Sequence, residues 1–211
     1  MKNANIKNII FDLGDVILNI DVPLAYDEFV KLSGKEKAEI LELVQKHQLF
    51  QKFETGQIDE PTFRNEVRSM LGLPDLEDET IDTAWNILLL DIPTERIELI
   101  QNLANHYKLF LLSNTSSIHI TQVNKILQKT SGHASLDLLF EKVFLSYEMG
   151  LMKPDLKIYQ DVLSQAAIKA EETIFLDDNA DNIKAAASLG IEAIHVQKPL
   201  TILDYLKDYA V

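Results

Sequence analysis

The chain has 211 residues, 46% of them hydrophobic, which suits a globular protein of one domain, or of one domain carrying a smaller inserted one. Its 33 acidic and 20 basic residues give a formal net charge of −13, which argues against a nucleic-acid partner and an anionic membrane surface. It has no cysteine, no secretory signal pattern and no apolar run near the roughly 20 residues of a membrane span, so we expect a soluble, cytoplasmic protein without disulfides.

Five short apolar segments predict buried β-strands. The first, 6–11, is rich in β-branched residues and ends at Asp12. The other four are 108–112, 139–145, 173–176 and 192–196. Most of them are nearly continuous apolar runs, which are typical of strands covered on both faces in a parallel sheet.

Helical patterns alternate with these strands in the second half of the chain. Apolar residues recur at helical spacing in 95–105, 156–167 and 180–189, and Gly190 follows the last of these segments as a helix-ending glycine. The alternation predicts βαβ units and therefore an α/β fold with a doubly wound parallel sheet.

Residues 21–92 depart from this alternation and predict a small all-helical insert after the first strand. Ser33 begins a capping-box pattern that predicts a helix to about residue 47, and Asp59 begins a second helix that runs to about residue 70. A third amphipathic stripe includes Trp85. We expect these stripes to bury the insert's own core, while 1–20 and 93–211 form the sheet domain.

Polar side chains follow four of the predicted strands. They are Asp12 after the first, Ser113, Asn114 and Thr115 after the second, Lys153 beyond the third, and Asp177 and Asp178 after the fourth. Ligands of open parallel sheets bind at this edge. Three carboxylates that lie close together need a cation, and Mg²⁺ prefers oxygen ligands together with a substrate phosphate. A lysine and a hydroxyl suit the phosphoryl group, and one carboxylate can act as its nucleophile.

Each of these signals has an ordinary alternative. Asp12 alone is typical of a turn or helix cap, and the acidic run that starts at Asp177 suits a helix N-terminus. A Ca²⁺-binding EF-hand loop starting at Asp177 fails, because its sixth residue is Asn182 rather than glycine and its twelfth is Ser188 rather than glutamate. The coincidence of four signals at four strand ends favours the phosphoryl-transfer site.

The same residues resemble, in order, the four motifs of the haloacid dehalogenase superfamily. The matching stretches are Phe11-Asp12-Leu13-Gly14-Asp15-Val16, Leu112-Ser113-Asn114, Lys153-Pro154 and Phe175-Leu176-Asp177-Asp178-Asn179. The helical insert resembles the small cap of that superfamily. Within it, 53–58 resembles cap sequence in the branch of sugar-phosphate phosphatases and the epoxide hydrolase N-terminal domain.

The resemblance implies a role for each motif residue. Asp12 would attack phosphorus and form an aspartyl-phosphate. The Asp12 carboxylate, the Gly14 carbonyl and Asp178 would ligate Mg²⁺, with Asp177 holding a metal-bound water or lying just outside the ligand shell. Ser113 and the backbone amide of Asn114 would bind phosphate oxygens, Lys153 would neutralise charge between Asp12 and the phosphate, and Asn182 would help to order the metal loop.

Gly14 departs from the pattern of most phosphatases in this superfamily, which have a second aspartate there as general acid and base. Such help is worth about 10²–10⁴ in rate, so we expect a slower phosphatase that favours good leaving groups such as sugar 1-phosphates. Asp15 is the next residue and could substitute through a water, although adjacent side chains on extended backbone diverge, which favours a solvated Asp15.

The expected function is hydrolysis of a small phosphorylated metabolite, with sugar phosphates favoured, by a Mg²⁺-dependent phosphatase. The alternatives are a phosphomutase and a non-catalytic sugar-phosphate sensor. The acidic pair disfavours metal-free halide displacement, and its position late in the chain excludes a phospho-accepting receiver. No pattern fixes the oligomeric state, and the five histidines show no metal-ligand spacing.

Overall fold

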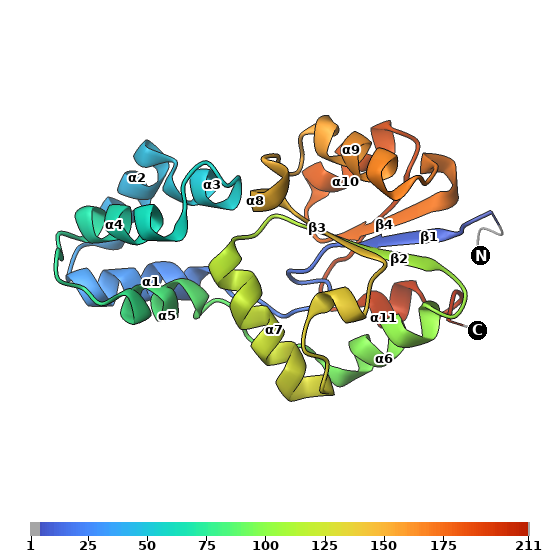
Figure 1. The fold of residues 1–211 in the computed structure, drawn as a ribbon, viewed down its shortest axis with the longest axis horizontal. Helices are drawn as coiled ribbons and strands as arrows, with labels where there is room; N and C mark the ends of the chain where they lie inside the picture. The colour runs from blue at the N-terminus through green and yellow to red at the C-terminus, as the bar shows by residue number, and fades with distance from the viewer. Residues whose placement is uncertain (1–4, 211) are drawn as a thin grey trace.

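A five-stranded parallel sheet lies at the centre of the sheet domain (Figure 1). The computed structural model of the protein describes residues 5–210, apart from the side chain of His47. The strand order is β3-β2-β1-β4-β5, with every pairing parallel, which confirms the predicted doubly wound sheet. The strands are β1 (Asn8–Phe11), β2 (Lys108–Ser113), β3 (Lys142–Leu145), β4 (Thr173–Asp177) and β5 (Glu192–His195).

Alternate residues of each central strand enter different cores, as the period of two requires. In β1, Ile9 and Phe11 belong to one buried cluster and Ile10 to another. The helices that cover the first face are α6 (Thr94–Leu103), α7 (Ser117–Ser131) and α11 (Ile202–Tyr205); those on the second are α9 (Leu156–Ala166) and α10 (Ala180–Ser188). None of the helices between residues 5 and 210 could span a membrane.

The third strand is shorter than the sequence predicts. A 3₁₀ turn, η1 (Leu136–Leu138), precedes it, and pairing with β2 runs only from Lys142 to Leu145. Leu139 is buried but has helical backbone angles, so its burial comes from packing under the sheet edge and not from a ladder. The shorter elements at this end of the molecule are α8 (Ser146–Met149) and the 3₁₀ turn η2 (Ala170–Glu172).

Five helices between β1 and α6 pack around a second core, to which α7 adds Ile118, and lie beside the sheet, away from both termini (Figure 1). They are α1 (Val22–Ser33), α2 (Lys37–His47), α3 (Leu49–Glu54), α4 (Glu60–Leu71) and α5 (Asp78–Asn86). Phe29, Phe63 and Trp85 are among the buried side chains of this cluster. The separate core supports the predicted division into a sheet domain of 1–20 and 93–211 and a helical cap of 21–92. Residues 1–4 and 211 of the sheet domain lie outside the described residues, and the division stays a prediction.

The predicted capping box at Ser33 is wrong. Ser33 is the last residue of α1, and its hydroxyl donates to the Phe29 carbonyl oxygen at 2.8 Å. Gly34 then adopts φ +68°, which ends the helix, and α2 begins after Glu36 with no side-chain cap. The signal at Asp59 is confirmed, since its carboxylate accepts from the Thr62 amide at 2.9 Å at the start of α4.

Candidate active site

Three carboxylates converge where β1 and β4 end. Phe11 is in register with Leu176, so Asp12 follows β1 directly beside Asp177, the last residue of β4. One oxygen from each of Asp12, Asp177 and Asp178 lies within 4.8 Å of the others. Asp12 and Asp177 are buried, whereas Asp178 is exposed. The expected meeting of strand-end carboxylates is therefore present.

Lys153 joins two of these carboxylates from the loop before α9. Its Nζ lies 2.7 Å from Asp12 Oδ1 and 2.7 Å from Asp177 Oδ2, and its side chain is 1% exposed. Burial alone would lower the pKa of Lys153, but the charges of both carboxylates raise it above its usual value. Lys153 is therefore a fixed cation, placed where the sequence predicts the phosphate-binding lysine.

Asp177 is held on all sides by hydrogen bonds. Besides Lys153, its carboxylate accepts from the Asn179 amide at 2.8 Å and from Asn182 Nδ2, which lies 3.0 Å from each oxygen. Asn179 caps the N-terminus of α10, so this loop is fixed to the helix that follows it. His195 at the end of β5 adds a contact of 2.8 Å between Nε2 and the Asp178 carbonyl oxygen.

The carboxylates disfavour one another's charge. The pKa of Asp12 is raised to about 7, mainly by burial; the charge of Lys153 lowers it and that of Asp177 raises it. Burial and the nearby charges of Asp177 and Asp15 also raise the pKa of Asp178. A divalent cation among these oxygens would relieve that repulsion. A donor set of hard oxygens fits Mg²⁺, so the residues present suit the ion that the sequence predicts.

The space beside Gly14 is already filled. A Cβ at Gly14 would lie 2.9 Å from Ile20 Cδ1, so a larger residue there would require Ile20 to move. The next residue, Asp15, has φ +52°, and its Oδ1 accepts from the Ile20 amide at 3.3 Å and pairs with Lys198 at 2.9 Å. Both contacts hold the Asp15 carboxylate, and neither involves Asp12.

Asn114 positions Lys153 through a contact that the sequence does not reveal. Its side-chain amide donates to the Lys153 carbonyl oxygen and accepts from the Lys153 amide, both at 2.9 Å. The two residues are 39 positions apart, so no local pattern could have shown this clamp. Ser113, at the end of β2, is 3% exposed and lies beside the clamp.

A cavity of about 380 Å³ lies between the sheet edge and the cap. Its lining includes Gly14, Ser113 and Asn114 from the sheet domain, and Tyr26, Glu54 and Trp85 from the cap. A second hollow, of about 640 Å³, brings Glu54 and Thr55 opposite Lys153. The predicted phosphate-binding residues therefore open into space that the cap partly encloses.

The cap supplies polar residues to this cavity that sequence reasoning did not assign. Glu54 is half-buried, and burial raises its pKa to about 7. Burial raises the pKa of Tyr26, and the charge of Glu54 raises it further. His119 of α7 also lines the cavity and stacks on Trp85 with ring centroids 4.5 Å apart. The one sequence signal for the segment around Glu54 is the resemblance of 53–58 to cap sequence of the same family branch.

His119 should make the fold sensitive to acid. Burial lowers its pKa from 6.5 to about 3, so the unfolded chain takes up a proton that the folded chain excludes, and stability falls as the pH drops below 6.5. Between pH 7 and pH 4 this costs about 3 kcal/mol. His119→Phe, which keeps an aromatic ring against Trp85, should lose less stability over that interval by about this amount in urea unfolding. Equal losses in the two proteins would contradict this.

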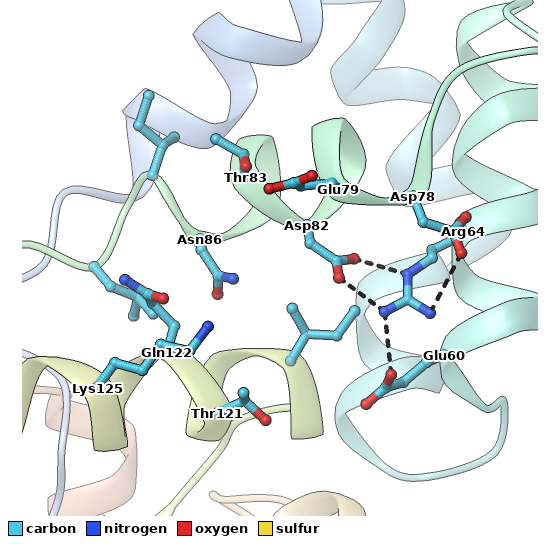
Figure 2. Close-up of a pocket in the computed structure, with 13 residues that line it drawn as sticks. Glu60, Arg64, Asp78, Glu79, Asp82, Thr83, Asn86, Thr121, Gln122 and Lys125 are labelled. Carbon is cyan, nitrogen blue, oxygen red and sulfur yellow. Dashed lines mark hydrogen bonds and ion pairs between the residues drawn. The ribbon is translucent and has the colours of Figure 1, made fainter.

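A larger cleft of about 770 Å³ lies between the cap and α7 and contains none of the strand-end residues (Figure 2). Figure 2 shows Arg64 between Glu60 and Asp82. Its guanidinium lies 3.1 Å from the Glu60 carboxylate and 2.8 Å from that of Asp82, and the Ser117 hydroxyl of α7 donates to Glu60 at 2.7 Å. Arg64 pairs with both carboxylates, and the Ser117 hydrogen bond joins cap to sheet domain, so we assign the cleft a structural role.

Comparison with known proteins identifies the family. The model of haloacid dehalogenase-like hydrolases matches residues 6–190. The chain is 29% identical to a D-ribitol-5-phosphate phosphatase of Bacteroides thetaiotaomicron over 89% of this chain and 90% of the relative. It is 29% identical to a glyceraldehyde 3-phosphate phosphatase of Methanocaldococcus jannaschii, over 92% and 86%. The protein belongs to the haloacid dehalogenase-like hydrolases, which confirms the resemblance of its motifs.

A solved structure supports the same conclusion. A haloacid dehalogenase family enzyme of Bacteroides thetaiotaomicron, crystallised with magnesium and inorganic phosphate, is 36% identical and superposes with a TM-score of 0.85. The match covers 92% of this chain and 96% of that one. The fold of the sheet domain and the cap is therefore that of this family.

Proposed function

We propose that the protein is a Mg²⁺-dependent phosphatase of small phosphomonoesters, with sugar phosphates favoured. The observation that carries the proposal is the convergence of Asp12, Asp177, Asp178 and Lys153. The neighbouring residues Gly14, Ser113 and Asn114 line a cavity that the cap partly encloses. Relatives named as phosphatases of ribitol 5-phosphate and glyceraldehyde 3-phosphate, and a neighbour crystallised with magnesium and phosphate, support it.

In the proposed reaction Asp12 attacks phosphorus, the bond to the leaving oxygen breaks, and an aspartyl-phosphate forms that water later hydrolyses. Lys153 neutralises charge between Asp12 and the phosphate, while Ser113 and the Asn114 amide bind phosphate oxygens. Asn114 also holds the Lys153 backbone in place through its side chain. These roles explain why a lysine so deeply buried contacts a carboxylate whose side chain is 11% exposed.

The metal would be held by the carboxylates of Asp12 and Asp178 and the carbonyl of Gly14, with Asp177 close by. When bound, Mg²⁺ supplies positive charge to the transferring phosphoryl group. Asp177 already accepts four hydrogen bonds and ion-pair contacts from Lys153, Asn179 and Asn182, which favours an orienting role for it over direct ligation.

Removal of Mg²⁺ tests the proposal. We expect phosphate release from a panel of sugar and nucleotide phosphates to fall at least about 10²-fold in chelator and to return when Mg²⁺ is added back. Phosphate binding measured by calorimetry should also be nearly absent in chelator, since carboxylates then dominate the site. Tight metal-free phosphate binding would contradict the proposal, and binding without turnover in Mg²⁺ would favour the sensor.

A further inference from the structure

Glu54 faces both hollows around the candidate active site. It is the last residue of α3 and lines the cavity that contains Gly14, Ser113 and Asn114, and also the hollow that contains Lys153. Within the described part of the chain its carboxyl group has no hydrogen-bond partner. This half-buried carboxyl group lies opposite the residues that would hold a phosphate. It is therefore placed to contact the leaving group of a substrate, which is the part attached to the phosphate on the cap side.

Three groups of the sheet domain could be expected to protonate the leaving oxygen, and none of them is available. Gly14 has no side chain, and Ile20 fills the space that a side chain there would need. The Asp15 carboxylate is held by Lys198 and the Ile20 amide. Asp177 is occupied by Lys153 and Asn182. None of these groups is free to give a proton to an oxygen that leaves the phosphate on the cavity side.

Glu54 is fixed relative to the sheet domain. The turn after it includes Gly56, which has φ +66° and approaches the backbone of α8 so closely that a Cβ there would lie 2.2 Å from the Tyr147 carbonyl oxygen. Thr55 is buried and its hydroxyl donates to the Gln51 carbonyl oxygen at 2.7 Å. The Thr55 hydrogen bond holds the end of α3 together, and the close approach of Gly56 to α8 sets this end of the cap against the domain that carries Asp12.

The surroundings suit a carboxyl group that carries a proton near neutral pH. The titratable groups that share the two hollows with Glu54 are Tyr26, His119, Lys153 and Asp155. His119 has its pKa lowered by burial and stays neutral, and Lys153 is paired with Asp12 and Asp177. Burial therefore decides the charge of Glu54, and it raises the pKa to about 7.

The geometry points to Glu54 as the general acid of the reaction, a role that rests on the proposed phosphatase function. As Asp12 bonds to phosphorus and the bond from phosphorus to the leaving oxygen breaks, the Glu54 carboxyl group gives its proton to that oxygen. The alcohol departs neutral and Glu54 is left as a carboxylate. It regains a proton from the water that hydrolyses the phosphorylated Asp12, so the cycle ends with inorganic phosphate, free Asp12 and protonated Glu54.

Glu54→Gln tests this role with two substrates that carry no hydroxyl groups. The leaving group of benzyl phosphate is a strongly basic alkoxide unless its oxygen is protonated as the bond breaks. The leaving group of p-nitrophenyl phosphate is a weakly basic phenolate, which departs without a proton. In single turnovers with Mg²⁺ and excess enzyme, we expect alcohol release from benzyl phosphate to fall about 10²–10⁴-fold and nitrophenol release to fall less than tenfold. Glu66→Gln, an exposed change of the same kind on the cap, should leave both rates unchanged.

The pH dependence gives a second readout. The wild-type rate on benzyl phosphate should decline as the pH rises through about 7, since the acid must be protonated, and this decline should vanish in Glu54→Gln. Equal losses on both substrates, or no loss on either, would overturn the role of Glu54 while leaving the phosphatase intact. If the wild type released no phosphate from these two substrates and none from the sugar and nucleotide phosphates of the panel, the proposed function itself would fail.

Discussion

Replacing Asp12 with asparagine is expected to abolish phosphate release, by about 10⁴-fold or more, because an amide cannot attack phosphorus. Asp12 is the proposed nucleophile, and neither neighbouring carboxylate is placed to substitute for it: Asp177 is saturated with hydrogen bonds and Asp178 is exposed at the rim. The measurement is phosphate release from the best substrate of the panel in saturating Mg²⁺. Asp208→Asn, an exposed change of the same kind in the sheet domain, should retain full activity.

The same variant separates loss of chemistry from loss of fold. Asp12→Asn removes one of three mutually repelling carboxylates and leaves Lys153 paired with Asp177, so the metal-free protein should be at least as stable as the wild type in urea. Intact mass spectrometry after rapid acid quench should detect a phosphorylated wild-type protein and an unmodified variant. Comparable turnover by the two proteins would show that Asp12 is not the nucleophile.

The sheet and its polar rim could be predicted because both depend on local sequence. Continuous apolar runs such as 108–112 predict strands buried on two faces, and the residue that ends such a run falls at one edge of the sheet whatever the rest of the chain does. For this reason the sequence alone predicts that Asp12, Ser113 and Asp177 lie at the same edge of the sheet. The largest discrepancy is at 139–141, where Leu139 and Phe140 are buried outside the strand and so produce the same apolar pattern as a strand.

The features that could not be predicted have two causes: a local pattern that fits two positions, and contacts between segments far apart in the sequence. Ser33 occurs where a helix ends and another soon begins, so one local pattern was compatible with both positions. The clamp between Asn114 and Lys153, and the raised pKa of Glu54, arise only when the chain folds. Gly56 gave no local sign that a backbone carbonyl of α8 lies against it. The residues that line the cavity between cap and sheet domain come from segments far apart in the sequence, so a local pattern does not show that they are neighbours.

Lys153→Met should destabilise the metal-free protein by about 3–5 kcal/mol, because it removes the cation from two buried carboxylates. Asp177 is fully buried and Asp12 nearly so, and neither can recover its lost charge partner from solvent. The measurement is the free energy of urea unfolding in chelator. Lys157→Met removes an exposed ion pair with Asp161 and should change stability by less than about 1 kcal/mol.

Two further conditions show whether charge is the cause. Mg²⁺ should restore part of the stability of Lys153→Met, because a cation at the carboxylates compensates for the missing ammonium group, although phosphate release should stay low without the lysine. Lowering the pH below 7 should also reduce the difference from wild type, since Asp12 without Lys153 loses the charge that lowers its pKa and so takes up a proton more readily. A deficit that neither Mg²⁺ nor acid reduces would point to lost side-chain packing at position 153 instead of unpaired charge.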